Sequence, residues 1–256
     1  MTGLNSPLGV PVACRVCGDE RTIRAHIVPA AFGRLASAGN GKPLKTIARD
    51  SRKVSNSGIW DATILCHACD RVLGGYDKYA IELWRSALTS PPDFKAEEFE
   101  IEADASRVVK FLMAILWRAS VTTRPEFSTV RLGPYEPKFK RTIFGPDSAA
   151  PDAHPRVMIS RYRSRHLPMH HMYSMPIYST LGGANCYVFA LGGCRIVVKV
   201  DKRPFPRFCE RYIINGRDVI RGLMVDFEDT TEFAAMRDVI HERWRADAAR
   251  RHTSLQ

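Results

Sequence analysis

The hydrophobic positions after residue 71 recur at spacings of three and four, which is the period of one face of an α-helix. The recurring positions are Val72, Tyr76, Tyr79, Ala80 and Leu83. The pattern predicts a helix that continues to Leu88 and stops at Ser90–Pro91–Pro92, because proline disfavours helical backbone in the residue before it.

A second helical pattern covers Ala103–Thr122. Its apolar positions are Val108, Phe111, Leu112, Ile115, Leu116 and Ala119. Arg107, Lys110 and Arg118 share a different face, so the pattern predicts a helix that buries one side and exposes charge on the other. Asp104 lies in the predicted first turn, where the helix dipole favours a negative charge.

The pattern becomes typical of β-structure between Arg156 and Phe227. Runs rich in β-branched and aromatic residues predict strands at 157–159, 172–178, 186–191 and 195–200. Glycine pairs at 182–183 and 192–193 separate strand-like runs, as expected where tight turns need a positive φ. Helical periodicity returns over Thr230–Arg251 and predicts a C-terminal helix.

The remaining segments indicate how these parts are joined. The stretch from Ala36 to Gly58 is polar and basic, and it predicts a loop or a loose hairpin. Residues 125–156 are rich in proline and glycine and predict a connector with a short helix near Pro137–Ile143. We therefore predict an α+β protein in three parts: an N-terminal module at 1–90, a helical segment with its connector at 91–150, and a β-rich region with a C-terminal helix at 151–256.

The composition of the 256-residue chain is that of an ordinary globular protein. Hydrophobic residues make up 45% and charged residues 25%, which excludes disorder over the whole length. No apolar run approaches the ~18 residues that a membrane helix needs. Residues 1–12 lack the basic and apolar segments of a secretory signal. We therefore expect a cytoplasmic protein with no membrane partner.

The charge is strongly basic. Lysine and arginine together number 38 against 27 for aspartate and glutamate, which gives a net charge of +11. A basic protein attracts polyanions, and nucleic acid is the commonest of them. A solubilising surface would explain the same excess, so the charge indicates a nucleic-acid partner without establishing one.

Four of the seven cysteines fall in two Cys-x-x-Cys pairs, Cys14 with Cys17 and Cys66 with Cys69. In a reducing compartment, such pairs indicate metal binding more than disulfides. Four thiolates favour one tetrahedral Zn²⁺ ion, so we predict a shared structural zinc. Two independent redox pairs are the alternative, although neither pair has the βαβ context of a thioredoxin-like motif. The other three cysteines are most simply core residues.

Two short strings lie beside the cysteine pairs. The first is AHIVP, which contains His26, and the second is ILCHACD, in which Asp70 directly follows the last cysteine. Together with the cysteine pairs, these strings resemble the HNH, or ββα-metal, endonuclease family, in which a β-hairpin and a helix enclose one catalytic divalent metal. The resemblance covers about residues 14–80 and extends to uncharacterised phage and bacterial proteins with similar strings. It implies that the N-terminal module is a zinc-stapled ββα-metal (HNH-like) unit.

The resemblance also implies roles for single residues. His26 would be the general base that activates water, a role suited to an imidazole pKa near neutrality. Asp70 would be a ligand of a catalytic Mg²⁺ or Mn²⁺ ion, which would stabilise charge on the phosphate. Asp61 stands where many members carry the Asn that orients the histidine, so it could polarise His26 or bind the metal. The implied activity is hydrolysis of phosphodiester bonds in double-stranded DNA, in a phage, prophage or bacterial defence setting.

The residue before the histidine departs from the family pattern, because members usually carry a metal-binding Asp where this chain has Ala25. Asp61 or Asp77 would then complete the metal site, or the site would be weak or absent. The structural alternatives are a packing role for His26, a helix N-cap for Asp70 and a turn role for Asp61. The alternative function is a non-catalytic zinc-finger nucleic-acid-binding protein with a degenerate HNH site. A further alternative function is that of a structural or partner-binding protein.

A cluster of basic residues later in the chain is the remaining candidate. Three arginines precede three histidines: Arg161, Arg163, Arg165, His166, His170 and His171. A second metal site would need further ligands, and no carboxylate or cysteine lies nearby in the sequence. Phosphate contacts and an exposed strand face are the other interpretations.

Overall fold

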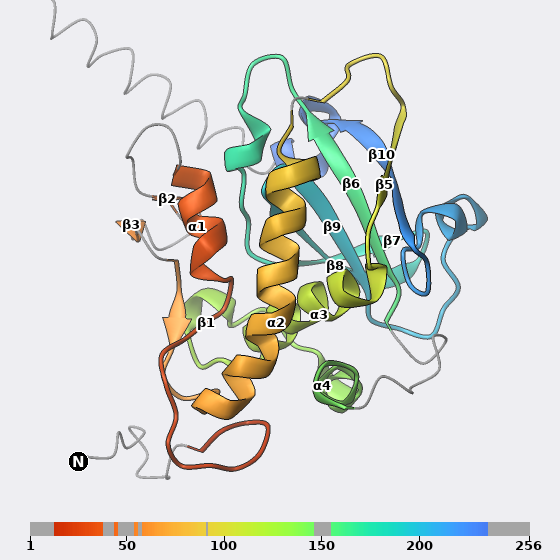
Figure 1. Cartoon of the computed structure of the whole chain (residues 1–256). Helices are drawn as coiled ribbons and strands as arrows, with labels where there is room; N and C mark the ends of the chain where they lie inside the picture. The colour runs from red at the N-terminus through yellow and green to blue at the C-terminus, as the bar shows by residue number, and fades with distance from the viewer. Residues whose placement is uncertain are drawn as a thin grey trace, which may run out of the picture.

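A six-stranded β-sheet with helices against one face organises the computed structural model of the chain (Figure 1). The structure describes residues 13–37, 44–45, 54–55, 58–90, 92–145 and 155–234. The strands of the sheet are β5 (Glu98–Glu102), β6 (Val157–Arg163), β7 (Ile177–Leu181), β8 (Ala184–Leu191), β9 (Cys194–Lys199) and β10 (Val219–Asp226). Their order is β5-β10-β6-β9-β8-β7, and only β10 and β6 pair in parallel. The predicted α+β class is confirmed.

The inner strands of the sheet are apolar on both faces. In β8, Tyr187 and Phe189 face the core beneath the helices, whereas Cys186 and Val188 belong to a second apolar cluster on the opposite face. Burial on both faces explains why the sequence here is a near-continuous apolar run instead of an alternating one. The second face is covered by residues 204–214, which contribute the apolar side chains Phe205, Cys209, Tyr212 and Ile213.

Two glycine pairs close the hairpins between β7 and β8 and between β8 and β9, as the sequence predicts. Gly192 and Gly193 have φ values of +56° and +83°, and Gly182 and Gly183 have almost the same values. A side chain strongly disfavours two successive positive φ values, and this turn type matches the twist of the strands it joins.

Strand positions were predicted less accurately than strand existence. β7 begins at Ile177, five residues later than predicted, while β5 and β10 were not predicted at all. β5 alternates glutamates with Phe99 and Ile101, and it lies at the edge of the sheet beside β10. The predicted helical segment at 91–150 therefore also supplies an edge strand to the sheet.

Four α-helices lie among the described residues: α1 (Ala30–Ser37), α2 (His67–Leu83), α3 (Ala105–Val121) and α4 (Glu136–Phe144). A π-helical turn over Trp84–Leu88 extends α2 to the predicted end. α2 starts at His67, directly after Cys66 of the second cysteine pair, which is five residues before the first position of its apolar pattern. The short helix predicted in the connector is confirmed as α4, whereas α1 was not predicted.

The predicted exposed charged face of α3 is wrong. Lys110 is 7% exposed and Arg118 only 1%, whereas Arg107 is exposed as predicted. α2, α4 and the sheet all pack against α3, so little of its surface remains for solvent. Asp104 precedes the helix as its N-cap, and its carboxylate accepts a hydrogen bond from the Arg107 backbone N–H at 3.1 Å.

One apolar core joins the N-terminal module to the sheet. Phe32 of α1 stacks on Phe111 of α3 at 5.3 Å between ring centroids. Trp84, at the end of α2, is fully buried and donates its indole N–H to the carbonyl of Leu191 at 3.0 Å. The three remaining cysteines, Cys186, Cys194 and Cys209, are buried as predicted.

Two predicted segments lie partly outside the described residues. β2 (Leu44–Lys45) and β3 (Val54–Ser55) pair antiparallel, which confirms a loose hairpin within the basic stretch. The predicted C-terminal helix is described only over 231–234, where Phe233 packs against Phe227. In the described part of the chain, no helix has the length and apolar character needed to cross a membrane.

Candidate functional site

A short hairpin followed by a helix brings the two cysteine pairs together. β1 (Ala25–His26) and β4 (Trp60–Asp61) are antiparallel, with Ala25 opposite Asp61 and His26 opposite Trp60. The pairing extends beyond these strands, because the N–H of Ile23 donates to the carbonyl of Leu65 at 2.8 Å. The segment after the first cysteine pair therefore runs beside the segment before the second.

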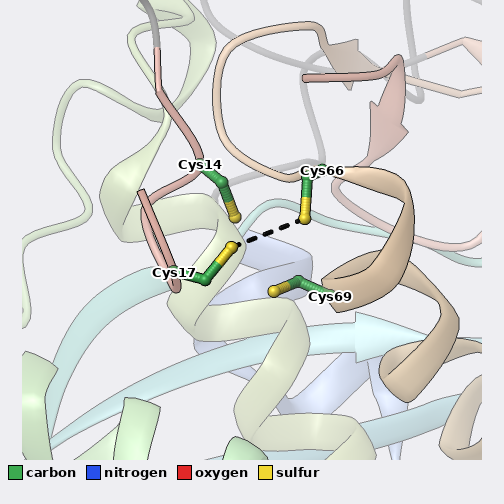
Figure 2. Close-up of side chains that lie close together, drawn as sticks. All are labelled: Cys14, Cys17, Cys66 and Cys69. Atoms are coloured by element: carbon green, nitrogen blue, oxygen red, sulfur yellow. Dashed lines mark hydrogen bonds between the residues drawn. The ribbon is translucent and has the colours of Figure 1, made fainter. Parts of the chain in front are cut away.

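The four cysteines of these pairs point toward one another (Figure 2). Their four Sγ atoms all lie within 4.8 Å of one another, and Cys17 Sγ is 3.6 Å from Cys66 Sγ. Four thiolates around one tetrahedral ion, with bonds of about 2.3 Å, have sulfur atoms about 3.8 Å apart. Cys14, Cys17, Cys66 and Cys69 thus form a cluster that can hold a metal ion.

The electrostatics of the cluster favour a cation. Burial raises the pKa of the Cys14 thiol, but the backbone N–H groups of Cys17, Cys66 and Val16 outweigh it and hold this pKa at about 7. Burial and the neighbouring thiols raise the pKa of Cys69 well above its ordinary value. Several thiolates confined to this volume repel one another, and a bound cation relieves that repulsion.

His26 projects from the hairpin on the side away from the core. Its neighbours Ala25 and Ile27 are 1% and 0% exposed, and side chains alternate along a strand, so His26 takes the other side and is half-buried. Its Nε2 atom is buried and makes no hydrogen bond to the described residues. The side chain of Ala25 faces the apolar core, where a carboxylate would lose its solvation.

The surroundings of His26 keep its imidazole neutral. Burial is the main cause that lowers the pKa of His26 below 6.5, and the positive charge of Arg118 adds to it. The carboxylates of Asp70 and Asp77 act in the opposite direction. At pH 7 the ring is therefore in the form that can accept a proton.

Asp70 and Asp77 lie two turns apart on α2, so they share one side of the helix. Asp77 is not a free carboxylate, because the Arg118 guanidinium contacts both of its oxygens at 3.3 and 3.4 Å. Burial raises the pKa of Asp77, and Arg118 opposes that rise. Within the described ranges, no second group of three potential ligands is as close together as the cysteines.

Asp61 is engaged in a structural role. Its buried carboxylate accepts hydrogen bonds from the N–H and hydroxyl of Thr63, at 2.8 and 2.7 Å. The other oxygen accepts a short hydrogen bond from the hydroxyl of Thr122, at the end of α3. Asp61 thus forms a turn after β4 and ties the hairpin to α3, whereas the turn role considered from the sequence placed Asp61 before a strand.

Residues of α3 are the part of this site that sequence reasoning missed. Arg118 forms an ion pair with Asp77, and its positive charge lowers the pKa of His26. Thr122, directly after α3, donates a hydrogen bond to Asp61. Arg118 interrupts an otherwise apolar helix pattern, and this interruption was the only available signal. The pattern could not reveal its partner, which is 41 residues away in the chain.

The basic cluster near residue 165 has a structural explanation. Arg163 forms an ion pair with Asp226 on the neighbouring strand β10 at 2.7 Å, and it also donates to the carbonyl of Ala96. Arg161 donates to the carbonyl of Ser90. These two arginines hold the loop before β5 against the sheet. His166 is exposed, and the side chain of His171 lies outside the described residues.

No protein-family profile, curated protein or solved structure matches this chain.

Proposed function

We propose that the cysteine cluster binds one structural Zn²⁺ ion and that the chain is a metal-dependent endonuclease acting on double-stranded DNA. Four sulfur ligands in a tetrahedral arrangement suit zinc, which is redox-inert and accepts thiolates readily. The net charge of +11 supports a polyanionic partner.

One observation carries the proposal of catalysis: the half-buried, neutral His26 with an unbonded Nε2 atom, in the electrostatic field of two carboxylates. This nitrogen is buried in the structure, so the ring or the groups covering it would have to shift before Nε2 could accept a proton from a water molecule that attacks phosphorus. The antiparallel hairpin orients the ring, and the core side chains of Ala25 and Ile27 fix the strand beneath it. A divalent ion held by Asp70 would stabilise the charge that develops on the phosphate.

The test compares two histidines of the same module. His26→Ala should reduce Mg²⁺- or Mn²⁺-dependent cleavage of duplex DNA by about 10²–10⁴-fold, because a general base contributes about that much. His67→Ala is the matched control, since His67 is exposed on α2 and, among the described residues, its Nδ1 lies 3.3 Å from the Arg71 guanidinium. Metal content and DNA affinity should stay unchanged in both variants.

The pH profile supplies a second measurement. Protonated His26 cannot act as a base, so activity should fall as pH falls through its pKa. Because this pKa lies below 6.5, the acid limb of the cleavage rate should have its midpoint below pH 6.5. Cleavage that survives His26→Ala would place the catalytic centre elsewhere in the chain.

A second candidate function is nucleic-acid binding without catalysis. It is favoured by the buried Ala25 at a ligand position, and by the hydrogen bonds that engage Asp61 and Asp77. In that case the wild-type protein would bind duplex DNA with strong salt dependence and would cleave no substrate with any divalent metal.

A further inference from the structure

A cationic cleft of about 340 Å³ lies between α4 and the loop that follows β9. The cationic side chains that line it are Lys138, Arg156, Lys199, Lys202 and Arg203. Two carboxylates, Asp201 and Glu210, line it as well. Cations therefore outnumber acids by five to two in a space large enough for a phosphate group and its neighbours.

The two carboxylates are already paired. Asp201 contacts Lys199 at 3.3 Å and Arg203 at 2.7 Å, and it also accepts from the Asn185 backbone N–H. Glu210 pairs with Arg156 at 3.1 Å. These ion pairs fix the loop after β9 and leave positive charge in excess.

Two of the three excess positive charges belong to Lys138 and Lys202, which are both exposed. Across the described ranges, neither ammonium group has a carboxylate partner, and Lys138 Nζ lies over the Tyr135 ring at 5.4 Å. These two ammonium groups present donors to an anion without first breaking an ion pair of their own.

α4 connects this cleft to the cysteine cluster. Lys140, two residues after Lys138, donates its Nζ hydrogen to the carbonyl of Arg15 at 2.8 Å. Arg15 lies between Cys14 and Cys17, so one helix touches the first cysteine pair and lines the cleft.

We propose that this cleft binds phosphate groups of a nucleic-acid backbone, with Lys138 and Lys202 as the main contacts. The choice of nucleic acid as the source of the phosphate rests on the proposed function. Phosphate contacts of this kind position a strand without reading its sequence. Under this proposal, the connector and the β-rich region hold the nucleic-acid substrate.

The experiment uses the full chain with its metal and a short fluorescent DNA duplex in a salt series. The variant Lys138→Ala/Lys202→Ala should lower the slope of log affinity against log salt by about two, one unit for each lost phosphate contact. Its Kd at moderate salt should rise about tenfold or more. The control, Arg85→Ala/Lys95→Ala, removes the same charge from exposed positions outside the cleft and should keep the wild-type slope.

A cleft variant that binds duplex with the wild-type slope and affinity would overturn the proposal. If His26→Ala loses cleavage but still binds duplex with the wild-type slope, catalysis and phosphate binding are separate, which supports the cleft as the binding surface. If the wild-type protein binds no duplex, the proposed function fails, and the cleft is then tested with inorganic pyrophosphate by NMR. Saturable shifts that disappear in Lys138→Ala/Lys202→Ala would support a site for free phosphate compounds, whereas no shifts would overturn a phosphate site of either kind.

Discussion

The N-terminal module and the six-stranded sheet are held together by different forces. The strands of the module, β1 and β4, have two residues each, and a long polar segment separates them. The strands of the sheet have five to eight residues and apolar clusters on both faces. A two-residue pair contributes few hydrogen bonds against the entropy of ordering the segment between its strands. We infer that the module depends on its cysteine cluster, whereas the sheet depends on burial.

The two regions nevertheless share one core. The far end of α2 carries Trp84 into the sheet, while its first turn carries Cys69 of the cluster. The module is therefore bound to the sheet at one end and to the cysteine cluster at the other. If the cluster holds the proposed metal ion, its loss should open the cysteine end first.

The largest effect is expected from removing the metal ligands. Cys66→Ser/Cys69→Ser should abolish metal binding and expose the amides of residues 14–27 and 59–66 to hydrogen exchange, while the amides of β6, β8 and β9 stay protected. The metal supplies folding free energy directly, at about 10–16 kcal/mol in zinc-finger peptides. Metal analysis and hydrogen exchange measure both effects. Cys186→Ala, at a buried cysteine outside the cluster, should keep the metal. Equal loss of protection in the sheet would contradict the difference between the regions.

The next effect tests the shared core. Trp84→Ala should lower the free energy of unfolding by about 3–5 kcal/mol, because it removes a fully buried indole. Trp84→Phe keeps most of the apolar contact and loses the hydrogen bond to Leu191, so its cost should be smaller, at about 1–3 kcal/mol. Urea unfolding, monitored by probes in the module and in the sheet, should show the same shift of the unfolding midpoint in both regions. A shift confined to the module would show that its core is separate.

A smaller effect is expected from the ion pair between Arg118 and Asp77. Arg118→Met leaves the carboxylate of Asp77 poorly solvated, and we expect a loss of about 2–4 kcal/mol at pH 7. Burial raises the pKa of Asp77 above that of an unfolded chain, so this loss should develop as pH rises and shrink as pH falls and the carboxyl becomes protonated.

The double variant Asp77→Asn/Arg118→Met is the control for this pair, since it removes both charges. It should recover much of the lost stability in denaturant unfolding at pH 7. Equal stability of the single and double variants at every pH would show that the pair is not coupled.

The smallest effect is expected at two glycines of α2, and a glycine of the sheet provides the contrast. Gly74→Ala and Gly75→Ala should each stabilise α2 by about 0.5–1 kcal/mol, because alanine favours helix and an added Cβ meets no atom within 4 Å. Gly222→Ala on β10 should destabilise, because its Cβ would lie 2.0 Å from the carbonyl oxygen of Ile159. Thermal unfolding measures all three. Destabilisation by the α2 variants would indicate a contact at this surface.

Local patterns in the sequence were sufficient for several features. The period of apolar positions predicted α3 and most of α2, and the prolines after Ser90 predicted where α2 ends. The glycine pairs predicted two hairpins. The spacing of the cysteines predicted that the four thiols would meet, and they do. The helices and hairpins depend on residues close together in the chain, and the cysteine cluster depends on two short motifs with a recognisable spacing, so local rules describe them.

Other features were decided only by the tertiary structure. Arg118 is buried because α2, α4 and the sheet surround α3, and its partner Asp77 is distant in the chain. The hydroxyl of Thr122 donates a hydrogen bond to the carboxylate of Asp61. Lys138 and Lys202 come from separate elements and line the same cleft. Charge and polarity reveal that such residues need partners, but which partner each one finds depends on how the elements pack. For this reason the sequence by itself determined the cysteine cluster and the periodic elements, and only the fold decided which charges are buried, paired or left for a ligand.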